Sequence, residues 1–268
     1  MSHGEQSSVP SKRRVLVFRG LVALTGLLFV AAGVTNARAG WVLVIGATGD
    51  QHAEANRWFT TVAGTADLIL AGCLLALAWW PRLSLLFFYF VTGFVVAALI
   101  NLPFVPEFAI VLAATVPALA TYPYWADLRA VTTWWRKPRI VPLVVSVAAA
   151  AVVFTVAAVA IGRQIGGTDA AAQANWWADY AEHASLLAVA ALIAGSGRPG
   201  WRILAGMAGA AWMYLGVVAV FLLPDHTASW GTLGGLLGLA IGLVLAAAAA
   251  VGDAAPRMVG RAAHGTAG

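Results

Sequence analysis

Apolar residues fill eight runs of the chain, each about twenty positions long and bounded by short polar or proline-containing turns. A helix needs about 20 apolar residues to cross a bilayer, whereas a strand of a transmembrane β-barrel shows about 10 residues of alternating polarity. These runs do not alternate, so we expect an all-α fold, a polytopic transmembrane helical bundle of eight spans. The predicted spans cover residues 15–35, 58–80, 83–102, 107–125, 140–161, 176–195, 201–223 and 231–251.

The composition fits a surface that faces lipid. Of the 268 residues, 61% are apolar and 10% are charged, and the mean hydropathy is +0.84. Soluble domains contain about 25% charged residues, so this chain has too few polar side chains to cover a water-exposed surface. The formal charge of +5 does not indicate a nucleic-acid partner, because the basic residues lie in short turns between the runs.

The basic residues also predict how the bundle is oriented. Eight spans place both termini on one side. If that side is cytoplasmic, only Arg38, Arg57 and Arg163 of the 16 lysines and arginines lie outside. Cytoplasmic loops are rich in Lys and Arg, so we predict a multi-pass protein of a bacterial-type inner membrane with both termini in the cytoplasm. Most of the 12 tryptophans lie near predicted span ends, where interfacial anchors are expected.

The two halves of the chain look alike. The segment Ala53–Trp58 (AEANRW) is similar to Ala172–Trp177 (AQANWW). Because each half has four spans, the repeats would be parallel, related by an axis along the membrane normal. The predicted organisation is a cytoplasmic tail at 1–14, a first repeat at 15–125, a basic linker at 126–139, a second repeat at 140–251 and a tail at 252–268.

The register between the two repeats is open. Counted from the cytoplasmic turns, Asp67 and Glu182 occupy equivalent positions. Counted from Asn56 and Asn175, they are four residues apart, about one helical turn. Both alignments cannot hold without an insertion, so the sequence leaves the pairing of the two carboxylates undecided.

Asp67 is the sharpest candidate for a functional group. It lies inside a predicted span, where an aspartate costs about 2.5–3.5 kcal/mol on insertion scales. Its carboxylate therefore faces a cavity or a partner, or carries a proton. A proton relay, a cation site and a lipid-headgroup contact are open as functions, and a hydrogen bond that fixes helix packing is the structural alternative.

A second group of candidates lies in the segment Asn175–His183. Asp179 and His183 are spaced i, i+4 and share a helix face, while Glu182 is expected to point about 100° away. A carboxylate that orients a histidine occurs in metal sites and around general bases. Together with His52 and His226, His183 could form a three-histidine metal site at the outer face. No His-x-x-x-His or Glu-x-x-His ligand pair is present, however, so we predict no metal site and assign no cofactor.

With the predicted orientation, the polar candidates gather in the outer third of the bundle. They include Asn36, Asn101, Asp179, Glu182, His183, Asp225 and His226, and His52 lies in an outer loop. The cytoplasmic turns are short and basic and hold nothing that resembles a catalytic loop. Any site is therefore expected to open toward the outer face.

Two other features point to packing. Cys73 is the single cysteine, so neither a disulfide within the chain nor a thiolate metal cage can form. The glycine-rich stretch Gly231–Gly242 lacks the Lys-Ser/Thr of a phosphate loop. Small residues at such spacings let membrane helices pack closely, and Gly72 and Gly93 are expected to act in the same way.

The first half resembles a known family. The stretch Phe18–Asn36 has Arg19 near its start and a Phe-x-x-x-Gly pattern, and Ala66–Gly72 (ADLILAG) is similar to a Glu-Leu-x-x-Gly pattern. Together, over about residues 15–125, they resemble the first two helices of DoxX-like four-helix membrane proteins. Asn36 stands where that family often has lysine, and Asp67 stands for its glutamate. The resemblance implies a four-helix fold and links to quinone-coupled sulfur oxidation and to oxidative-stress complexes.

Three functions follow as hypotheses. The first is a non-catalytic accessory subunit, or a lipid- or quinone-binding partner, of an envelope complex. The second is a proton-coupled transporter or lipid flippase, which the duplication and Asp67 favour. The third is a membrane enzyme that uses the outer carboxylates and His183. The partners expected are membrane lipids, a quinone, and a membrane protein or a second copy of the chain.

Overall fold

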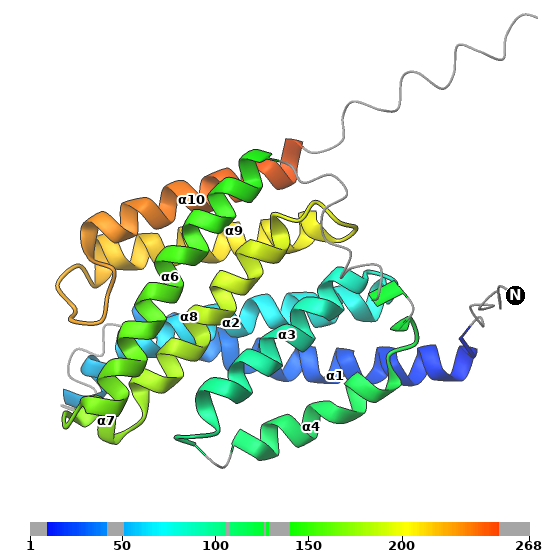
Figure 1. Ribbon diagram of the computed structural model, residues 1–268, viewed down its shortest axis with the longest axis horizontal. Helices are drawn as coiled ribbons and strands as arrows, with labels where there is room; N and C mark the ends of the chain where they lie inside the picture. Colours follow the sequence, from blue (N-terminus) through cyan, green and yellow to red (C-terminus); the bar gives the residue numbers. More distant parts are fainter. Residues whose placement is uncertain (1–9, 42–50, 106–107, 126, 129–139, 252–268) are drawn as a thin grey trace, which may run out of the picture.

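The computed structural model describes residues 10–41, 51–105, 108–125, 127–128 and 140–251, and within these ranges it is all-helical (Figure 1). The predicted all-α class is confirmed. The helices are α1 (Lys12–Ala37), α2 (Gln51–Trp79), α3 (Ser84–Asn101), α4 (Phe108–Thr121), α6 (Ile140–Gly166), α7 (Ala170–Gln173), α8 (Trp176–Ala194), α9 (Trp201–Val217) and α10 (Gly231–Val251), with a 3-10 turn η1 (Arg38–Gly40) and a π-helical segment η2 (Val218–Leu222).

Within the described ranges, six helices are long and apolar enough to cross a membrane, and the chain is a multi-pass membrane protein on that ground. They are α1 with η1, α2 from Asn56, α3, α6 from Leu143, α9 with η2, and α10. The other two predicted spans correspond to α4, which has 14 residues, and to α8, whose ionisable residues lower its hydropathy. The tails and most of the linker at 126–139 lie outside the described residues.

Most helix ends lie close to the ends of the apolar runs, but α6 continues past residue 161 to Gly166, and the start of α2 differs most. We predicted a loop over 36–57, but α2 begins at Gln51. The segment 51–57 is polar and therefore carries no hydrophobic signal, yet the helix needs no apolar residues beyond the membrane. The extension matters because it carries Asn56 and Arg57 on the helix. Two nitrogens of the Arg57 guanidinium donate to the carbonyls of Ala39 and Gly40 at the end of η1.

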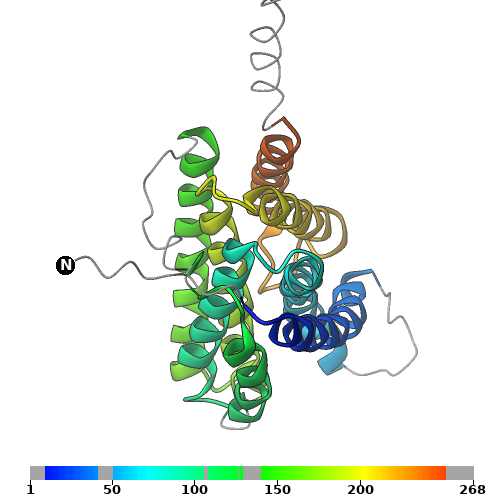
Figure 2. The same cartoon turned by 90° about the vertical axis from the view of Figure 1, so that its right-hand side faces the viewer.

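Helix α8 lies at the centre of the bundle. It packs against α2, α3, α6 and α9 (Figures 1 and 2). Of its 19 residues, all but Trp176, Asp179 and Leu192 are buried. A helix enclosed by protein on every side can hold ionisable groups that lipid would reject. The position of α8 thus explains why a polar helix sits within an otherwise apolar bundle.

The long helices form two rings, one in each half of the chain, and α8 belongs to the second. In the first half α1 contacts α2, α2 contacts α3, α3 contacts α4, and α4 returns to α1. In the second half α6, α8, α9 and α10 follow one another in the same cyclic order. The rings meet where α2 packs on α8 and α9, and where α3 packs on α8.

Glycines bring several helices into backbone contact, as predicted for the glycine-rich C-terminal helix. A Cβ on Gly242 would lie 2.6 Å from the carbonyl oxygen of Gly209, and a Cβ on Gly235 would lie 2.9 Å from that of Gly216. Both pairs join α9 to α10. Gly72 and Gly93 face Met207 and Leu186 respectively. The packing role predicted for these glycines is confirmed.

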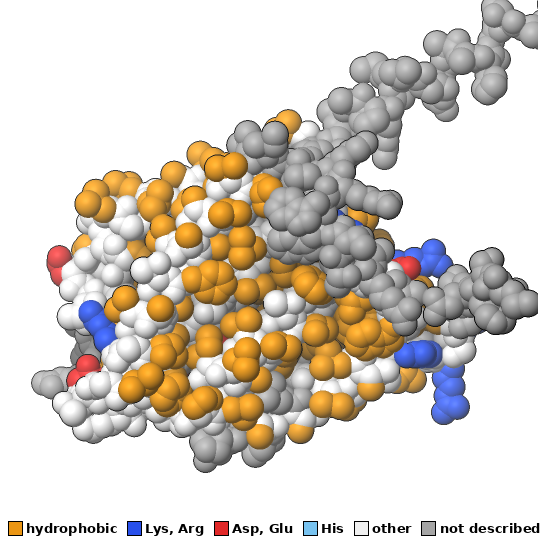
Figure 3. Space-filling view, viewed as in Figure 1, with side chains coloured by type: hydrophobic (Ala, Val, Ile, Leu, Met, Phe, Trp, Pro, Cys, Tyr) orange, Lys and Arg blue, Asp and Glu red, His pale blue; other side chains and the backbone are white. Residues whose placement is uncertain are grey.

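Charged side chains gather at the two ends of the bundle, with a broad apolar band between them (Figure 3). At one end Arg14 donates to carbonyls at the end of α4, Arg19 to the carbonyl of Trp79 at the end of α2, and Arg202 to carbonyls near the end of α10. Cations are favourable at helix C-termini, so these arginines stabilise the helix ends that meet there.

Candidate functional site

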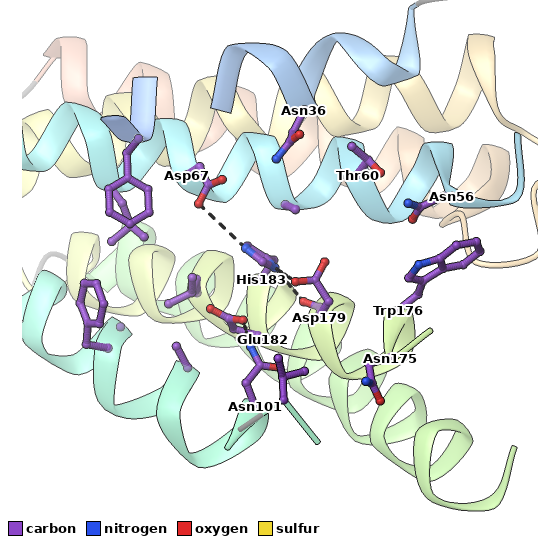
Figure 4. Close-up of a pocket in the computed structure, with 18 of the residues that line it drawn as sticks. Asn36, Asn56, Thr60, Asp67, Asn101, Asn175, Trp176, Asp179, Glu182 and His183 are labelled. Atoms are coloured by element: carbon purple, nitrogen blue, oxygen red, sulfur yellow. Dashed lines mark hydrogen bonds and ion pairs between the residues drawn. The ribbon is translucent and has the colours of Figure 1, made fainter. Parts of the chain in front are cut away.

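A cavity of about 540 Å³ lies between α2, α3 and α8, with α1 closing one side (Figure 4). Helix α2 contributes residues at helical spacing, Asn56, Thr60, Ala63, Asp67 and Leu70. The full lining is Phe29, Asn36, Asn56, Thr60, Ala63, Asp67, Leu70, Gly93, Phe94, Ala97, Asn101, Val105, Ala174, Asn175, Trp176, Asp179, Glu182, His183 and Leu186. The cavity is therefore built from both halves of the chain.

Five residues singled out from the sequence meet in this cavity. Asp67, Asn101, Asp179, Glu182 and His183 come from three helices and all line it. Figure 4 shows Asp67 on α2 facing His183 on α8, with Glu182 beside Asn101 of α3. The convergence of residues that are up to 116 positions apart is the main structural finding about the site.

The other candidates lie elsewhere. Asp225 is exposed in the turn before α10. The ring of His226 packs edge-on against Phe59, with centroids 6.2 Å apart, and its Nδ1 accepts a hydrogen bond of 3.2 Å from the backbone N–H of Ala228. The side chain of His52 falls outside the described residues. The structure therefore does not bring Asp225 and His226 into the cavity.

The start of α8 is held in place by two features of its sequence. Asn175 adopts a left-handed backbone conformation, φ 60°, which Asn tolerates better than most residues. From α6, Gln164 donates to the carbonyl of Ala172 and to Oδ1 of Asn175, and it accepts from the N–H of Ala178. These bonds fix the first turn of α8 and with it the direction of Asp179.

His183 is oriented by its own helix. Its Nδ1 lies 2.7 Å from the backbone carbonyl oxygen of Asp179 and 3.4 Å from Oδ1 of the same residue. The predicted shared face of Asp179 and His183 is confirmed. Because a carbonyl oxygen only accepts, Nδ1 carries the hydrogen and donates. In the neutral ring, Nε2 is then the unprotonated nitrogen, and it faces Oδ1 of Asp67 at 3.9 Å.

Glu182 corrects one prediction. We expected it to point away from Asp179 and His183, but it lines the same cavity, and its Oε2 accepts a hydrogen bond from Nδ2 of Asn101. The reason is the central position of α8, because α2 and α3 bound the cavity on two sides of that helix. Asp179, Glu182 and His183 thus lie on one polar face of α8 that is about 100° wide and is directed at the cavity.

The side chains that line the cavity are less exposed to solvent the deeper they lie. The Asp179 side chain is 47% exposed, whereas those of Asp67 and His183 are 13% and 11% exposed. Glu182 and Asn101 are buried. Asp179 therefore lies at the mouth, and the other groups lie deeper. Among the described residues that line the cavity there is no lysine or arginine, so three carboxyl groups face one imidazole without a fixed positive charge.

Sequence reasoning missed several lining residues. Asn56 and Thr60 are polar and lie next to or within an apolar run, and Phe29 and Phe94 supply apolar walls. Asn36, which also lines the cavity, was among the polar groups expected near the outer face. A signal existed for two of them, because Asn56 and Thr60 precede Asp67 by 11 and seven residues and so share its helix face. Nothing in the sequence of α1 or α3 indicated the two phenylalanines.

No protein-family model, curated protein or solved structure matches this chain.

Proposed function

We propose that the chain is an eight-span protein made of two parallel four-helix repeats, with both termini in the cytoplasm. In this arrangement α4 and α8 cross the membrane inside the protein, in addition to the six helices that can cross by length and apolarity. The identical cyclic order of contacts in the two halves supports a duplication. The gathering of arginines at one end of the described bundle supports the orientation.

Reciprocal glycine contacts support one register. Gly93 of α3 faces Leu186 of α8, and Gly72 of α2 faces Met207 of α9. If the two halves are exchanged by a shift of 114 residues, position 93 becomes 207 and position 72 becomes 186. Each of the two contacts is then the counterpart of the other. Asp67 and Glu182 are 115 residues apart and nearly fit this register. The two Asn residues at 56 and 175, 119 apart, do not fit it.

We further propose that the protein binds a positively charged solute in this cavity and carries it across the membrane. The observation that carries the proposal is the convergence of three carboxyl groups and a histidine, from both halves, in a cavity whose described lining residues include no lysine or arginine. Intramembrane ionisable residues that line a cavity typically mark ion or substrate pathways. Substrate sites at the interface of two repeats are typical of transporters.

This proposal favours the transporter over the other two hypotheses. An accessory subunit of a DoxX-like complex needs no buried cluster of carboxylates, and the resemblance to that family remains an expectation about the fold. A membrane enzyme would use the same groups, but among the described residues that line the cavity no serine or cysteine lies beside His183. The cluster is therefore explained best by binding.

Flux into proteoliposomes tests the proposal. We expect the wild-type protein to admit at least one of three probes, Mn²⁺, spermidine or tetraethylammonium, at least tenfold faster than a Glu182→Gln variant. The exposed Asp225→Asn variant serves as the matched control and should behave as wild type. Rates equal to those of empty liposomes for all three probes, or equal rates for wild type and Glu182→Gln, would show that the proposal is wrong.

A further inference from the structure

The distance between His183 and Asp67 fits two ligands that are joined by an ion between them. The two facing atoms, Nε2 and Oδ1, are 3.9 Å apart, which is too long for a direct hydrogen bond. Both are acceptors when the ring is neutral and the carboxyl group is ionised, so they repel unless a proton or a metal cation lies between them. A divalent ion with bonds of about 2.0–2.2 Å to nitrogen and oxygen joins atoms up to about 4.2 Å apart.

His183 also has the hydrogen bond that metal-binding histidines usually have. Such histidines typically donate their second ring N–H to a backbone carbonyl or a carboxylate, which fixes the tautomer and aims the other nitrogen at the ion. Here Nδ1 donates to the carbonyl of Asp179, 2.7 Å away. The nitrogen that remains is the one directed at Asp67 (Figure 4).

A second, independent observation comes from α3. Asn101 is 4% exposed and lines the cavity, and its Oδ1 has no hydrogen-bond partner although it is buried. Leaving a buried acceptor unsatisfied costs about 1–3 kcal/mol. A bound cation would satisfy this oxygen. The amide donates through Nδ2 to Glu182, so its orientation leaves Oδ1 for a ligand.

Further oxygen donors lie on α8. One donor atom each from Asp179, Glu182 and His183 can be chosen so that all lie within 4.8 Å of one another. The interaction with Asn101 uses only one of the two Glu182 carboxylate oxygens. Carboxylate oxygens of α8 therefore lie close to the imidazole whose Nε2 faces Asp67.

We propose that the cation bound in this cavity is a divalent first-row transition-metal ion, held by His183 Nε2 and Asp67, with Glu182 and Asn101 Oδ1 as further ligands. The inference rests on the proposed cation-binding function and names its class of solute. An imidazole ligand favours ions such as Fe²⁺ or Zn²⁺ over Ca²⁺ and Mg²⁺, which take oxygen ligands, and the oxygen donors around it also suit Mn²⁺. This revises our sequence-based prediction of no metal site, because the donors come from three helices and form no local motif.

Equilibrium dialysis of the full-length protein in lipid nanodiscs tests this inference, after metal has been removed with a chelator. With Mn²⁺ or Zn²⁺ as the probe, we expect one ion per chain. His183→Gln and Asp67→Asn should each weaken binding at least tenfold. His226→Gln, which changes a histidine outside the cavity, should bind as wild type, and circular dichroism should show the same helix content for all variants.

The outcomes separate this inference from the proposed function. If neither ion binds at one per chain, or if His183→Gln binds both ions as tightly as wild type, the metal site is wrong. Should spermidine or tetraethylammonium then still enter proteoliposomes in a Glu182-dependent manner, the proposed function stands without it. If an ion binds as described but no probe crosses the membrane, the metal site stands and the transport function falls.

Discussion

Replacing Asp67 by Asn and Glu182 by Gln together is expected to make the protein more stable and unable to bind its cation. Both substitutions keep the shape of the side chain and remove a buried negative charge. A carboxylate within the membrane costs about 2.5–3.5 kcal/mol, and the cavity lowers this penalty only in part. The apparent Tm of the double variant in detergent should therefore rise, on the order of 5 °C.

The same experiment measures the loss of binding. A ligand that binds only the folded protein raises its Tm with concentration, so Mn²⁺ should raise the Tm of the wild type and leave that of the double variant unchanged. Asp225→Asn removes an exposed carboxylate and should change neither value. A lower Tm for the double variant would mean that Asp67 and Glu182 are structural groups that hold the helices together.

Gly64→Ala is expected to disrupt the contact between α1 and α2. A Cβ at this position would lie 2.1 Å from the backbone nitrogen of Ala37 and 2.6 Å from the carbonyl oxygen of Gly33. Backbone atoms cannot turn aside as a side chain can, so the two helices must separate. Overpacking usually costs about 1–3 kcal/mol, and we expect a loss at or above the top of that range, seen as a lower Tm and poor yield.

Gly20→Ala is the matched control for this prediction. Gly20 also lies in a helix, α1, but a Cβ there meets no atom within 4 Å. Alanine is a better helix former than glycine by about 1 kcal/mol, so this variant should be as stable as wild type or slightly more stable. Equal Tm values for Gly64→Ala and wild type would contradict the close approach of α1 and α2.

Helix positions could be predicted from the sequence because the apolar runs report directly on what must be shielded from water. The run at 201–223, for example, matches α9 and η2, which end at Leu222. The sequence could not show which spans face lipid. Helix α8 has an ordinary apolar run after His183, and only its contacts with α2, α3, α6 and α9 reveal that it is enclosed.

The tryptophans illustrate the same limit. We expected most of them to be interfacial anchors, and Trp79 and Trp80 at the end of α2 are indeed exposed. Trp58, Trp177 and Trp212 are buried instead. The ring of Phe59, next to Trp58, lies 4.9 Å from that of Trp177, and so joins α2 to α8. A tryptophan near a span end can face lipid or protein, and hydropathy is the same in both cases.

The sequence points to individual residues of the site but does not show that they meet in one cavity. Asp67, Asn101 and Glu182 each attract notice as polar groups in apolar surroundings. Their meeting depends on α3 and α2 both packing on α8, which are contacts between segments about 80 to 116 residues apart. The prediction of an outward-opening site depends on the orientation and is still to be measured.

Cysteine accessibility in intact bacterial cells tests the central claim, a negatively charged cavity that opens outward, most directly. Cys73 is fully buried, so Cys73→Ala gives a silent background. Thr60 lines the cavity, and Thr60→Cys leaves every carboxylate in place.

We expect Thr60→Cys to react with a membrane-impermeant cationic thiosulfonate at least tenfold faster than with the anionic analogue. Asp127→Cys should react only after permeabilisation, because the eight-span arrangement places it in the cytoplasm. Modification of Thr60→Cys only in permeabilised cells, or faster modification by the anionic reagent, would contradict the account.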